Sequence, residues 1–337
     1  MSMNPNPDPE SNGVAVHRAS LLRELLVPLP DEVLHVNKKL TSLSETQDGV
    51  FVTFSDGAVE HFDAVIGADG IFGFVRNYVL QDTDNKYGPS PAEFWDSRAL
   101  VPIGKARAII GDTHFSADEV DCQHGWIGDG AFLLYDVLEN RTMSQIVISA
   151  IENDPPRGHD ERKRPLTRGF LEGALKNWLD GPIAKRIIDL TLDQPDPQRY
   201  SEWEHKVTPT YVNGRVCIAG DAAHAMTPWQ AAGAGQAMED AMILGALLGK
   251  VKNSGEINAA FKAYDAVRRP RCQRVIDSSR VTGMICCGRE EGVGLDPRKL
   301  LEALKDRWGF IMGLDLDEYK TEALRKMDEF LFVIGQD

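Results

Sequence analysis

The stretch that most constrains the fold runs from Gly214 to Leu248 and reads GRVCIAGDAAHAMTPWQAAGAGQAMEDAMILGALL. It begins with a short apolar run, Val216 to Ala219, which is typical of a fully buried parallel strand. The strand stops at Gly220 and Asp221, and Pro228 with the small residues after it opens a helix rich in Ala and Gly. The strand ends in a turn that carries one carboxylate, and the helix after it begins with Ala and Gly residues. This order predicts an α/β fold with a ligand site at the turn.

The spacing of apolar residues alone allows two interpretations of this turn. In the first, Gly233, Ala234 and Gly235 only let the strand and the helix pack closely. In the second, the carboxylate of Asp221 accepts hydrogen bonds from ribose-type hydroxyls, and the helix N-terminus offers unpaired N–H groups and a positive dipole to negative charge. The complete string of GDAAH, P, GAGQ and EDA favours the second interpretation.

That string resembles the flavin-contacting motif of the FAD-dependent aromatic-ring hydroxylases, the group that contains para-hydroxybenzoate hydroxylase and the salicylate hydroxylase-like monooxygenases. The resemblance implies that Gly220 and Asp221 bind the ribityl chain of FAD. It also implies that Pro228 lines the oxygen-reacting face of the flavin and that the helix start at 233–235 addresses the isoalloxazine edge.

A second block matches the same family. Phe62 to Gly70 is an apolar strand that ends in Asp69 and Gly70, and Arg76 follows in a segment predicted to be helical. An ordinary strand-to-turn Asp-Gly is common, so this block alone is a weak signal. Paired in order with the later Gly-Asp block, it implies that Asp69, Gly70 and Arg76 serve the FAD site, and that Asp69 lies near the approach of the nicotinamide cofactor.

A third block precedes these two. The segment from His17 to Leu26 is predicted to be a helix because its leucines recur at helical spacing. The family carries an arginine at the start of this helix that reaches FAD, and Arg18 matches it. A solvated charge is the alternative for a lone arginine on a helix.

One expected segment is missing from the sequence. A dinucleotide site of this type opens with a strand, a G-x-G-x-x-G turn and a helix. Residues 1–13 are instead polar and rich in Pro and Asn. We therefore expect an incomplete Rossmann-type domain that lacks a βαβ unit of on the order of 30 residues, weak FAD binding, and an Asp63–Ala68 strand without one neighbour. An internal start, a partner chain that supplies the segment, and a degenerate protein without FAD are open explanations, of which the intact flavin-side residues favour the first.

The rest of the chain predicts a mixed α/β (α+β) protein with interleaved domains. We assign residues 14–95 and 200–290 to a discontinuous FAD-binding domain and residues 96–199 to an inserted substrate-binding domain. Residues 291–337 form a helical C-terminal region. Short runs at strand-like spacing predict a mostly antiparallel inserted sheet, with strands at Ala99–Ile103, Ala106–Gly111, Gly125–Gly128, Ala131–Val137 and Met143–Ile151.

Two segments outside these strands are also interpreted. Residues 152–168 are charged and Pro-rich, and they are predicted to be an exposed connector. From Ile257 onward the chain is predicted to be helical, with a Y-x-x-x-R-x-P-R pattern at Tyr264 to Arg271 that resembles the family's helix beside the flavin domain. We interpret these arginines as ion-pair partners of acidic residues on the preceding helix.

The amino-acid composition argues against some classes of binding partner. Lys and Arg number 37 against 51 Asp and Glu, and the net charge of -14 argues against nucleic acid or an anionic membrane surface. The five cysteines are odd in number and scattered, so they predict neither a disulfide framework nor a metal site. No apolar run approaches the ~20 residues of a transmembrane helix, and no signal peptide is recognised. We expect a cytoplasmic location.

The resemblance implies an FAD- and NAD(P)H-dependent monooxygenase that hydroxylates a phenolic small molecule with dioxygen, as in aromatic catabolism or secondary metabolism. Such enzymes place the oxygen chemistry on the flavin, and the candidate catalytic residues are Pro228, His224 and Tyr135. His224 is interpreted more readily as a structural neighbour of the flavin than as a base. The alternative is a flavin-free, non-redox homologue that acts as a lyase-like or binding protein. The substrate, the choice between NADH and NADPH, and the oligomeric state stay open.

Overall fold

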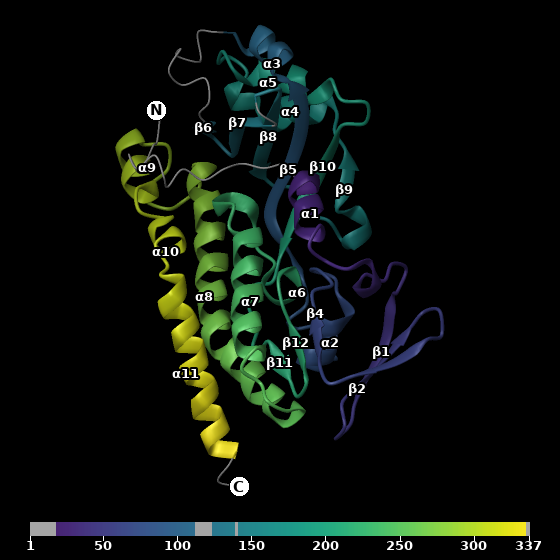
Figure 1. The fold of residues 1–337 in the computed structure, drawn as a ribbon. Coiled ribbons are helices and arrows are strands. Elements are labelled where there is room, and N and C mark those ends of the chain that lie inside the picture. Colours follow the sequence, from purple (N-terminus) through teal and green to yellow (C-terminus); the bar gives the residue numbers. More distant parts are fainter. Residues whose placement is uncertain (1–17, 112–122, 139–140, 335–337) are drawn as a thin grey trace. The chain divides into compact units, whose positions relative to one another are not determined.

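A computed structural model of the chain describes residues 18–111, 123–138 and 141–334. The polar run at 1–13, His17 and Cys122 lie outside these residues. The chain divides into two compact units (Figure 1). The first unit contains residues 1–34, 93–202 and 283–305, and the second contains residues 35–92, 203–282 and 306–337. Both units are therefore discontinuous in sequence.

The second unit is built on a three-stranded sheet in the order β11 (Val212–Asn213), β12 (Val216–Ile218) and β4 (Val65–Gly67). β12 pairs antiparallel with β11 and parallel with β4, with Ile218 opposite Gly67. All three residues of β12 are buried, which confirms the predicted buried parallel strand. In the described part of the chain β4 is an edge strand, and its Ile66 is 42% exposed, as expected for a strand with one neighbour.

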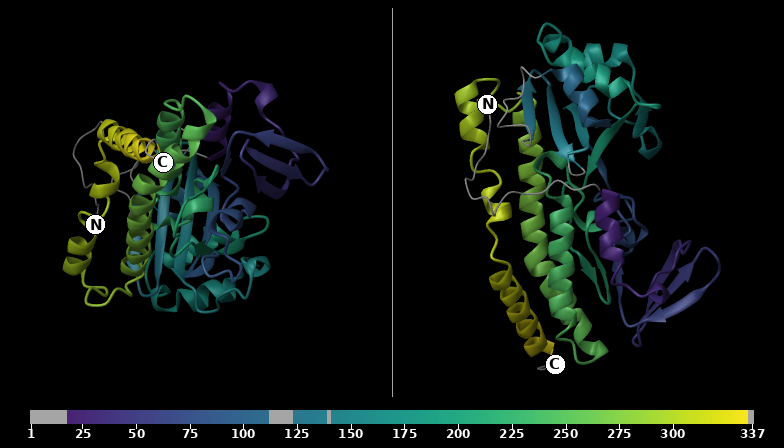
Figure 2. Two further views of the ribbon diagram at one scale, coloured as in Figure 1. Left: turned by 90° about the horizontal axis from the view of Figure 1, so that it is seen from below. Right: turned by 45° about the horizontal axis from the view of Figure 1, so that its top comes forward.

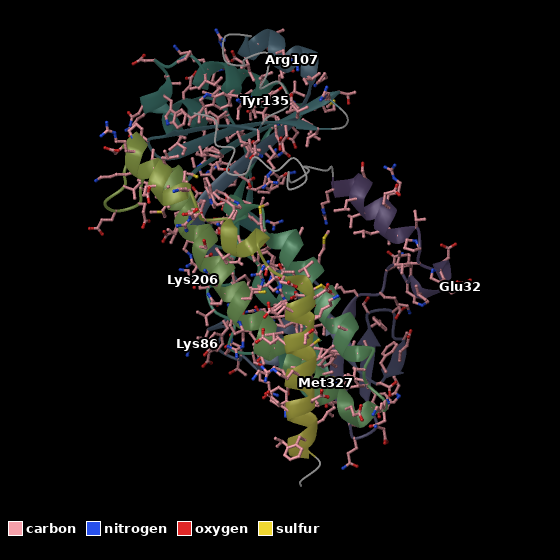
Figure 3. All side chains as sticks on the ribbon, turned by 60° about the vertical axis from the view of Figure 1, so that its left-hand side comes forward. Glu32, Lys86, Arg107, Tyr135, Lys206 and Met327 are labelled. Carbon is pink, nitrogen blue, oxygen red and sulfur yellow. The ribbon has the colours of Figure 1, made fainter. Side chains whose placement is uncertain are left out.

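Helices surround this sheet. They are α2 (Phe74–Leu80), α6 (Asp221–His224), α7 (Gly233–Leu248), α8 (Ile257–Cys286), α10 (Gly309–Met312) and α11 (Leu316–Ile334), with 3-10 turns η6 (Pro228–Gln230) and η7 (Ser254–Glu256). α7, α8 and α11 run side by side (Figures 1 and 2). Their apolar faces meet β12 in one core, which includes Phe261 of α8 and Met327 of α11. Met327 is labelled on α11 in Figure 3.

A separate antiparallel sheet completes the second unit. It consists of β1 (Leu40–Glu45), β2 (Val50–Phe54) and β3 (Val59–Phe62) in sequence order. The sequence predicts antiparallel strands at Leu34–Leu43 and Val50–Ser55, and the structure confirms this pair, although β1 begins at Leu40 and not at Leu34. Residues 34–39 form no strand, because the backbone passes through Asn37 at a positive φ of 61°.

The first unit contains a six-stranded sheet in the order β6-β7-β8-β5-β10-β9. Its strands are β5 (Ser90–Pro102), β6 (His124–Gly128), β7 (Ala131–Leu138), β8 (Met143–Ile151), β9 (Lys163–Pro165) and β10 (Gln198–Glu204), and every pairing given for them is antiparallel. α3 (Ile103–Ile110), α4 (Arg168–Ala174) and α5 (Ala184–Leu192) bury one face of this sheet.

One prediction for this unit is wrong, and a second is confirmed in its main point. The strand predicted at Ala106–Gly111 is part of helix α3, because the buried Ala106 and Ile110 lie four residues apart, which is helical spacing. The predicted connector at 152–168 is exposed at most of its positions, as predicted, although it also contains η4 (His159–Glu161) and the edge strand β9. Its Glu152 is buried because it pairs with Arg164 and Arg199.

The remaining elements of the first unit are helical. α1 (Arg18–Leu26) confirms the predicted helix and has no buried residue. It is followed by η1 (Asp31–Val33), and the unit also contains η5 (Lys176–Trp178) and α9 (Pro297–Leu304). Among the helices of the described segments, none is both long enough and apolar enough to cross a bilayer.

Candidate flavin site

Two aspartates follow the two parallel strands of the second unit. Asp69 lies two residues after β4, and Asp221 lies three residues after β12. Because Gly67 and Ile218 are paired in parallel register, both aspartates leave the sheet at the same edge. The crevice outside the carboxyl ends of parallel strands is where α/β sheets bind their ligands.

The backbone at both turns takes conformations that suit glycine. Gly70 has a φ of 83° and Gly220 a φ of 59°, a region that residues with a Cβ rarely adopt. No heavy atom lies within 4 Å of a Cβ built on Gly70, so the turn after Asp69 is open. Asp221 is exposed and is the first residue of α6, which leaves its carboxylate available to a ligand.

The start of α7 is open in the same way. No side chain caps its first N–H groups, and Ala234 and Gly235 are exposed. A Cβ on Gly235 would meet nothing within 4 Å, and one on Gly233 would meet only Met226 at 3.9 Å. A helix start with free N–H groups and no side chains in front of it is a site for negative charge.

Hydrogen bonds from α8 and from Trp308 hold the loop between α6 and α7 in place. Pro228 is exposed at the start of η6, and the neighbouring Thr227 is buried. Thr227 and Ser279 of α8 are joined by two hydrogen bonds, from the Thr227 hydroxyl to Ser279 Oγ (3.0 Å) and from the Ser279 hydroxyl to the Thr227 carbonyl (2.7 Å). The side chain of Trp308 donates to the Gln230 carbonyl at 3.2 Å. These contacts fix the loop that presents Pro228.

Arg76 braces the turn that carries Asp221. It is only 1% exposed, and its guanidinium donates to the carbonyls of Ala222 (2.9 Å) and Ala223 (3.2 Å) in α6. It also donates to the Tyr87 carbonyl and to the hydroxyl of Thr208. Burial lowers the pKa of Arg76 to about 10, so it stays charged at neutral pH. A direct contact of Arg76 with FAD stays a prediction.

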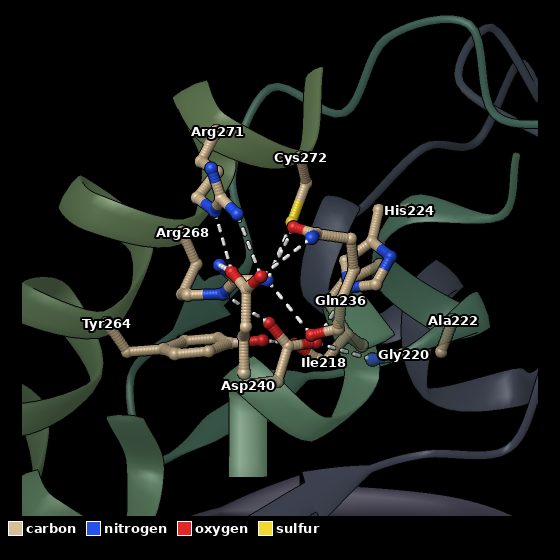
Figure 4. Close-up of polar contacts among 12 residues, drawn as sticks. Ile218, Gly220, Ala222, His224, Gln236, Asp240, Tyr264, Arg268, Arg271 and Cys272 are labelled. Carbon is tan, nitrogen blue, oxygen red and sulfur yellow. Dashed lines mark hydrogen bonds and ion pairs between the residues drawn. The ribbon is translucent and has the colours of Figure 1, made fainter. Parts of the chain in front are cut away.

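A buried network lies behind the same turn (Figure 4). Asp240 of α7 accepts through Oδ2 from the Gly220 N–H at 2.8 Å and lies 2.6 Å from Nε2 of His224. Its Oδ1 accepts from Nε of Arg268 at 2.7 Å. Arg268 also pairs with Glu239, and Glu239 pairs with Arg271. The predicted ion pairs between the late arginines and the preceding acidic helix are confirmed.

The charges of this network stabilise one another. Burial disfavours a charged imidazole, but Cys272 and Asp240 outweigh it and raise the pKa of His224 to about 10. Burial likewise opposes ionisation of Asp240, but the hydrogen bond and the charge of His224, together with Arg268, lower its pKa. A histidine that is fully buried and protonated at neutral pH cannot accept a proton from a substrate. The geometry favours the structural role of His224 over a catalytic one.

His224, Asp240 and Cys272 lie close enough together to share a metal ion. Arg268 donates to both Asp240 and Cys272, the latter at 3.3 Å. Its positive charge would repel a cation at this position. The ion pair with Arg268 favours an ion-paired network over a metal site at this cluster.

Most of the predicted site residues lie together in the second unit. These are Asp69, Gly70, Arg76, Gly220, Asp221, His224, Pro228, Gly233, Ala234 and Gly235. Arg18 and Tyr135 belong to the first unit. Arg18 is exposed at the start of α1. Tyr135, labelled in Figure 3, is 1% exposed and lies in the hydrophobic core of the first unit. This position favours a packing role for Tyr135 over the predicted catalytic one.

Sequence reasoning missed the central place of Asp240. The signal was available in the acidic pair Glu239-Asp240, which interrupts an apolar, Ala-rich helix. A carboxylate on the buried face of such a helix requires a buried cation. Arg268 is that cation.

Comparison with known proteins decides the family. A family model described as an FAD binding domain matches residues 182–279. The chain is 32% identical over 326 residues to 6-methylsalicylate 1-monooxygenase atA of Aspergillus terreus, covering 94% of this chain and 69% of that protein. It is 32% identical over 322 residues to a salicylate hydroxylase of Pseudomonas putida, covering 93% of this chain and 72% of that protein. The chain belongs to the FAD-dependent monooxygenase family.

The fold of this monooxygenase agrees with that membership. A solved structure of a salicylate hydroxylase substrate complex matches it with a TM-score of 0.80 and 28% identity, covering 91% of this chain and 75% of that one. The mixed α/β prediction is thereby confirmed. Members of the family are oxidoreductases that use FAD, with NADH or NADPH as the reductant.

The residues present fit part of an FAD molecule. Asp221 offers an exposed carboxylate to ligand hydroxyls, and no side chain lies in front of Gly70 in the turn after Asp69. The uncapped start of α7 provides N–H donors for the negative charge that a reduced flavin carries. In this monooxygenase Asp221 and the N-terminus of α7 would hold the cofactor.

Proposed function

We propose that this chain hydroxylates a phenolic aromatic compound of the salicylate type, with FAD held by the second unit and NADH or NADPH as the reductant. The observation that carries the proposal is the shared sheet edge at which Asp69 and Asp221 emerge beside the uncapped start of α7. The open turn after Asp69, the exposed carboxylate of Asp221 and an uncapped helix N-terminus at one edge suit a ligand that carries both hydroxyls and negative charge.

The residues of the second unit bind and orient the cofactor in this proposal. When bound, FAD supplies hydride acceptance and dioxygen activation. Asp221 accepts hydrogen bonds from its hydroxyl groups, and the N–H groups at the start of α7 stabilise negative charge on the reduced ring. Pro228 has no N–H to donate, so it offers the oxygen-reacting side an exposed wall without a hydrogen-bond donor.

The proposed salicylate-type substrate is supported by the names of two relatives and by an exposed sheet face in the first unit. Two relatives are named for salicylates, 6-methylsalicylate 1-monooxygenase and salicylate hydroxylase. The sheet of the first unit buries one face under α3, α4 and α5. Alternation along β5 places Arg98 and Leu100 on the opposite face, where both are exposed. We assign the substrate to the first unit and the flavin to the second.

The test is an oxygenation assay with excess FAD. Salicylate and 6-methylsalicylate would be incubated with the protein, NADH or NADPH, and ¹⁸O₂. The expected result is substrate-dependent oxidation of the reductant and a product that carries one ¹⁸O atom. Asp221→Ala, assayed in parallel, should need a higher FAD concentration to reach either signal.

Other outcomes of this assay overturn parts of the proposal. Oxidation of the reductant that yields only hydrogen peroxide with every phenol tested would contradict the hydroxylase function while keeping the flavin site. A protein that remains colourless and inert in excess FAD would contradict both, and would favour a flavin-free, non-redox binding or lyase-like protein.

We also propose a cytoplasmic location for the chain. The buried thiols of Cys217, Cys272 and Cys287 form no disulfide within the described residues, which supports a reducing compartment.

A further inference from the structure

Asp240 contacts both ends of the short helix that begins with Asp221. The Gly220 N–H, just before α6, donates to Oδ2 of Asp240 at 2.8 Å. His224, the last residue of α6, places Nε2 at 2.6 Å from the same oxygen. Asp221 lies between these two contacts and makes neither of them. A single buried carboxylate oxygen therefore holds both ends of the turn that presents the exposed carboxylate, while Arg76 holds the carbonyls between them.

We propose that Asp240 is a positioning residue of the flavin site, which sets the direction of the Asp221 carboxylate by holding both ends of α6. The inference rests on the proposed flavin-binding function of Asp221. Asp240 itself is fully buried and touches no ligand-facing surface, so it acts only through the turn.

The same network reaches the start of α7. Arg268 donates to Oδ1 of Asp240, and its other nitrogens donate to the carbonyl of Gln236 at 2.9 Å and to Gln236 Oε1 at 3.0 Å. Gln236 lies in the first turn of α7, beside the uncapped N–H groups. Asp240 and Arg268 thus connect the two elements assigned to the flavin, the Asp221 turn and the α7 N-terminus (Figure 4).

The end of strand β12 is anchored separately. The hydroxyl of Tyr264 donates to the Ile218 carbonyl at 3.1 Å, and the Ala219 N–H donates to the Gly67 carbonyl at 3.0 Å. The strand is therefore held in place without Asp240. The loss of Asp240 would release the turn while β12 keeps its position.

Glu239 provides a matched control on the same helix. It is the neighbouring residue of α7 and also pairs with Arg268. Its remaining hydrogen bonds within the described residues are to Arg271 and Gln236, and none of them reaches α6. Asp240→Asn and Glu239→Gln each remove one negative charge from Arg268, but only the first alters the Asp221 turn.

The first measurement needs no flavin. Hydrogen exchange of the Gly220–His224 amides would be followed in the parent, Asp240→Asn and Glu239→Gln. Asp240→Asn should accelerate exchange at these amides by about tenfold or more, and Glu239→Gln should leave them unchanged. Equal protection in Asp240→Asn and the parent would overturn the proposal.

A second variant covers the case in which Asp240→Asn does not fold. His224→Gln removes only one of the two links to α6. It should accelerate hydrogen exchange at the amides of Ala223 and of position 224 more than at the amide of Gly220. Unchanged exchange across the whole turn in this variant would equally overturn the proposal.

The second measurement is a double-mutant cycle on FAD affinity with Asp221→Ala and Asp240→Asn. If Asp240 acts through Asp221, Asp240→Asn should weaken FAD binding by about tenfold in the parent and have almost no further effect in the Asp221→Ala background. Additive losses would show that Asp240 does not act through Asp221. A parent that binds no FAD would overturn the proposed function, whereas the exchange result would still decide the role of Asp240 in the turn.

Discussion

Nε2 of His224 lies 2.6 Å from Oδ2 of Asp240, and both side chains are closed to solvent. The contact joins the end of α6 to the middle of α7, across the loop that carries Pro228. A buried ion pair of this kind is stable only when further hydrogen bonds satisfy its charges. The Gly220 N–H and Arg268 supply them here.

The His224–Asp240 pair predicts a specific pH dependence of stability. The pKa of His224 is raised from 6.5 to about 10 in the folded protein, so its contribution is fully present below pH 6.5 and is lost as the pH rises through about 10. Thermal midpoints measured across this range should fall in the parent and fall much less in His224→Gln. Parallel curves for the two proteins would contradict a protonated His224.

Arg76 should be among the most sensitive residues of the second unit. Arg76→Met removes the guanidinium donor of the Ala222 carbonyl, at about 1–3 kcal/mol for a buried unpaired acceptor, whereas the Ala223 carbonyl keeps its bond from the Thr208 hydroxyl. Denaturant melts should show this loss. Arg325→Met is the control, because Arg325 is exposed and its i,i+4 pair with Glu329 contributes only about 0.3–0.5 kcal/mol. Similar losses in the two variants would show that Arg76 does not brace the turn.

Gly67 and Gly245 should respond to alanine with opposite signs. A Cβ on Gly67 would lie 2.4 Å from the Cβ of Val75, so Gly67→Ala forces α2 away from β4 at about 1–3 kcal/mol. Gly245 lies inside α7 with nothing within 4 Å, and Gly245→Ala should stabilise the helix by up to about 1 kcal/mol. Thermal melts of both variants provide the comparison, and a tolerated Gly67→Ala would contradict the close approach of α2.

The sequence predicted the second unit better than the first. β12 and the helix after it carry strong local signals, a β-branched run followed by Gly-Asp and an Ala-rich segment, and the structure has both. The α3 segment failed because Ile109 and Ile110 suggested a strand, whereas burial of Ala106 and Ile110 on one side requires a helix. Local propensity was overridden there by packing against β8 and α5.

The sequence predicted the site residues that lie in one continuous segment, but not the contacts between residues that are far apart in the sequence. Asp221 and the α7 start could be identified because one strand–turn–helix segment contains them. The contacts of Asp240 with Arg268, and of Arg76 with Ala222, join residues 28 and 146 positions apart. Such pairings depend on how the helices pack, which periodicity does not determine.

The central claim is that Asp221 holds FAD in the second unit, and a binding titration tests it most directly. FAD would be titrated into the parent, Asp221→Ala and Asp317→Asn, the last being an exposed aspartate in the first turn of α11. The parent and Asp317→Asn should bind FAD equally and saturably. Asp221→Ala should bind roughly 10- to 100-fold more weakly, since a hydrogen bond to a charged group contributes about 1.5–3 kcal/mol. Equal affinity of Asp221→Ala and the parent would contradict the account.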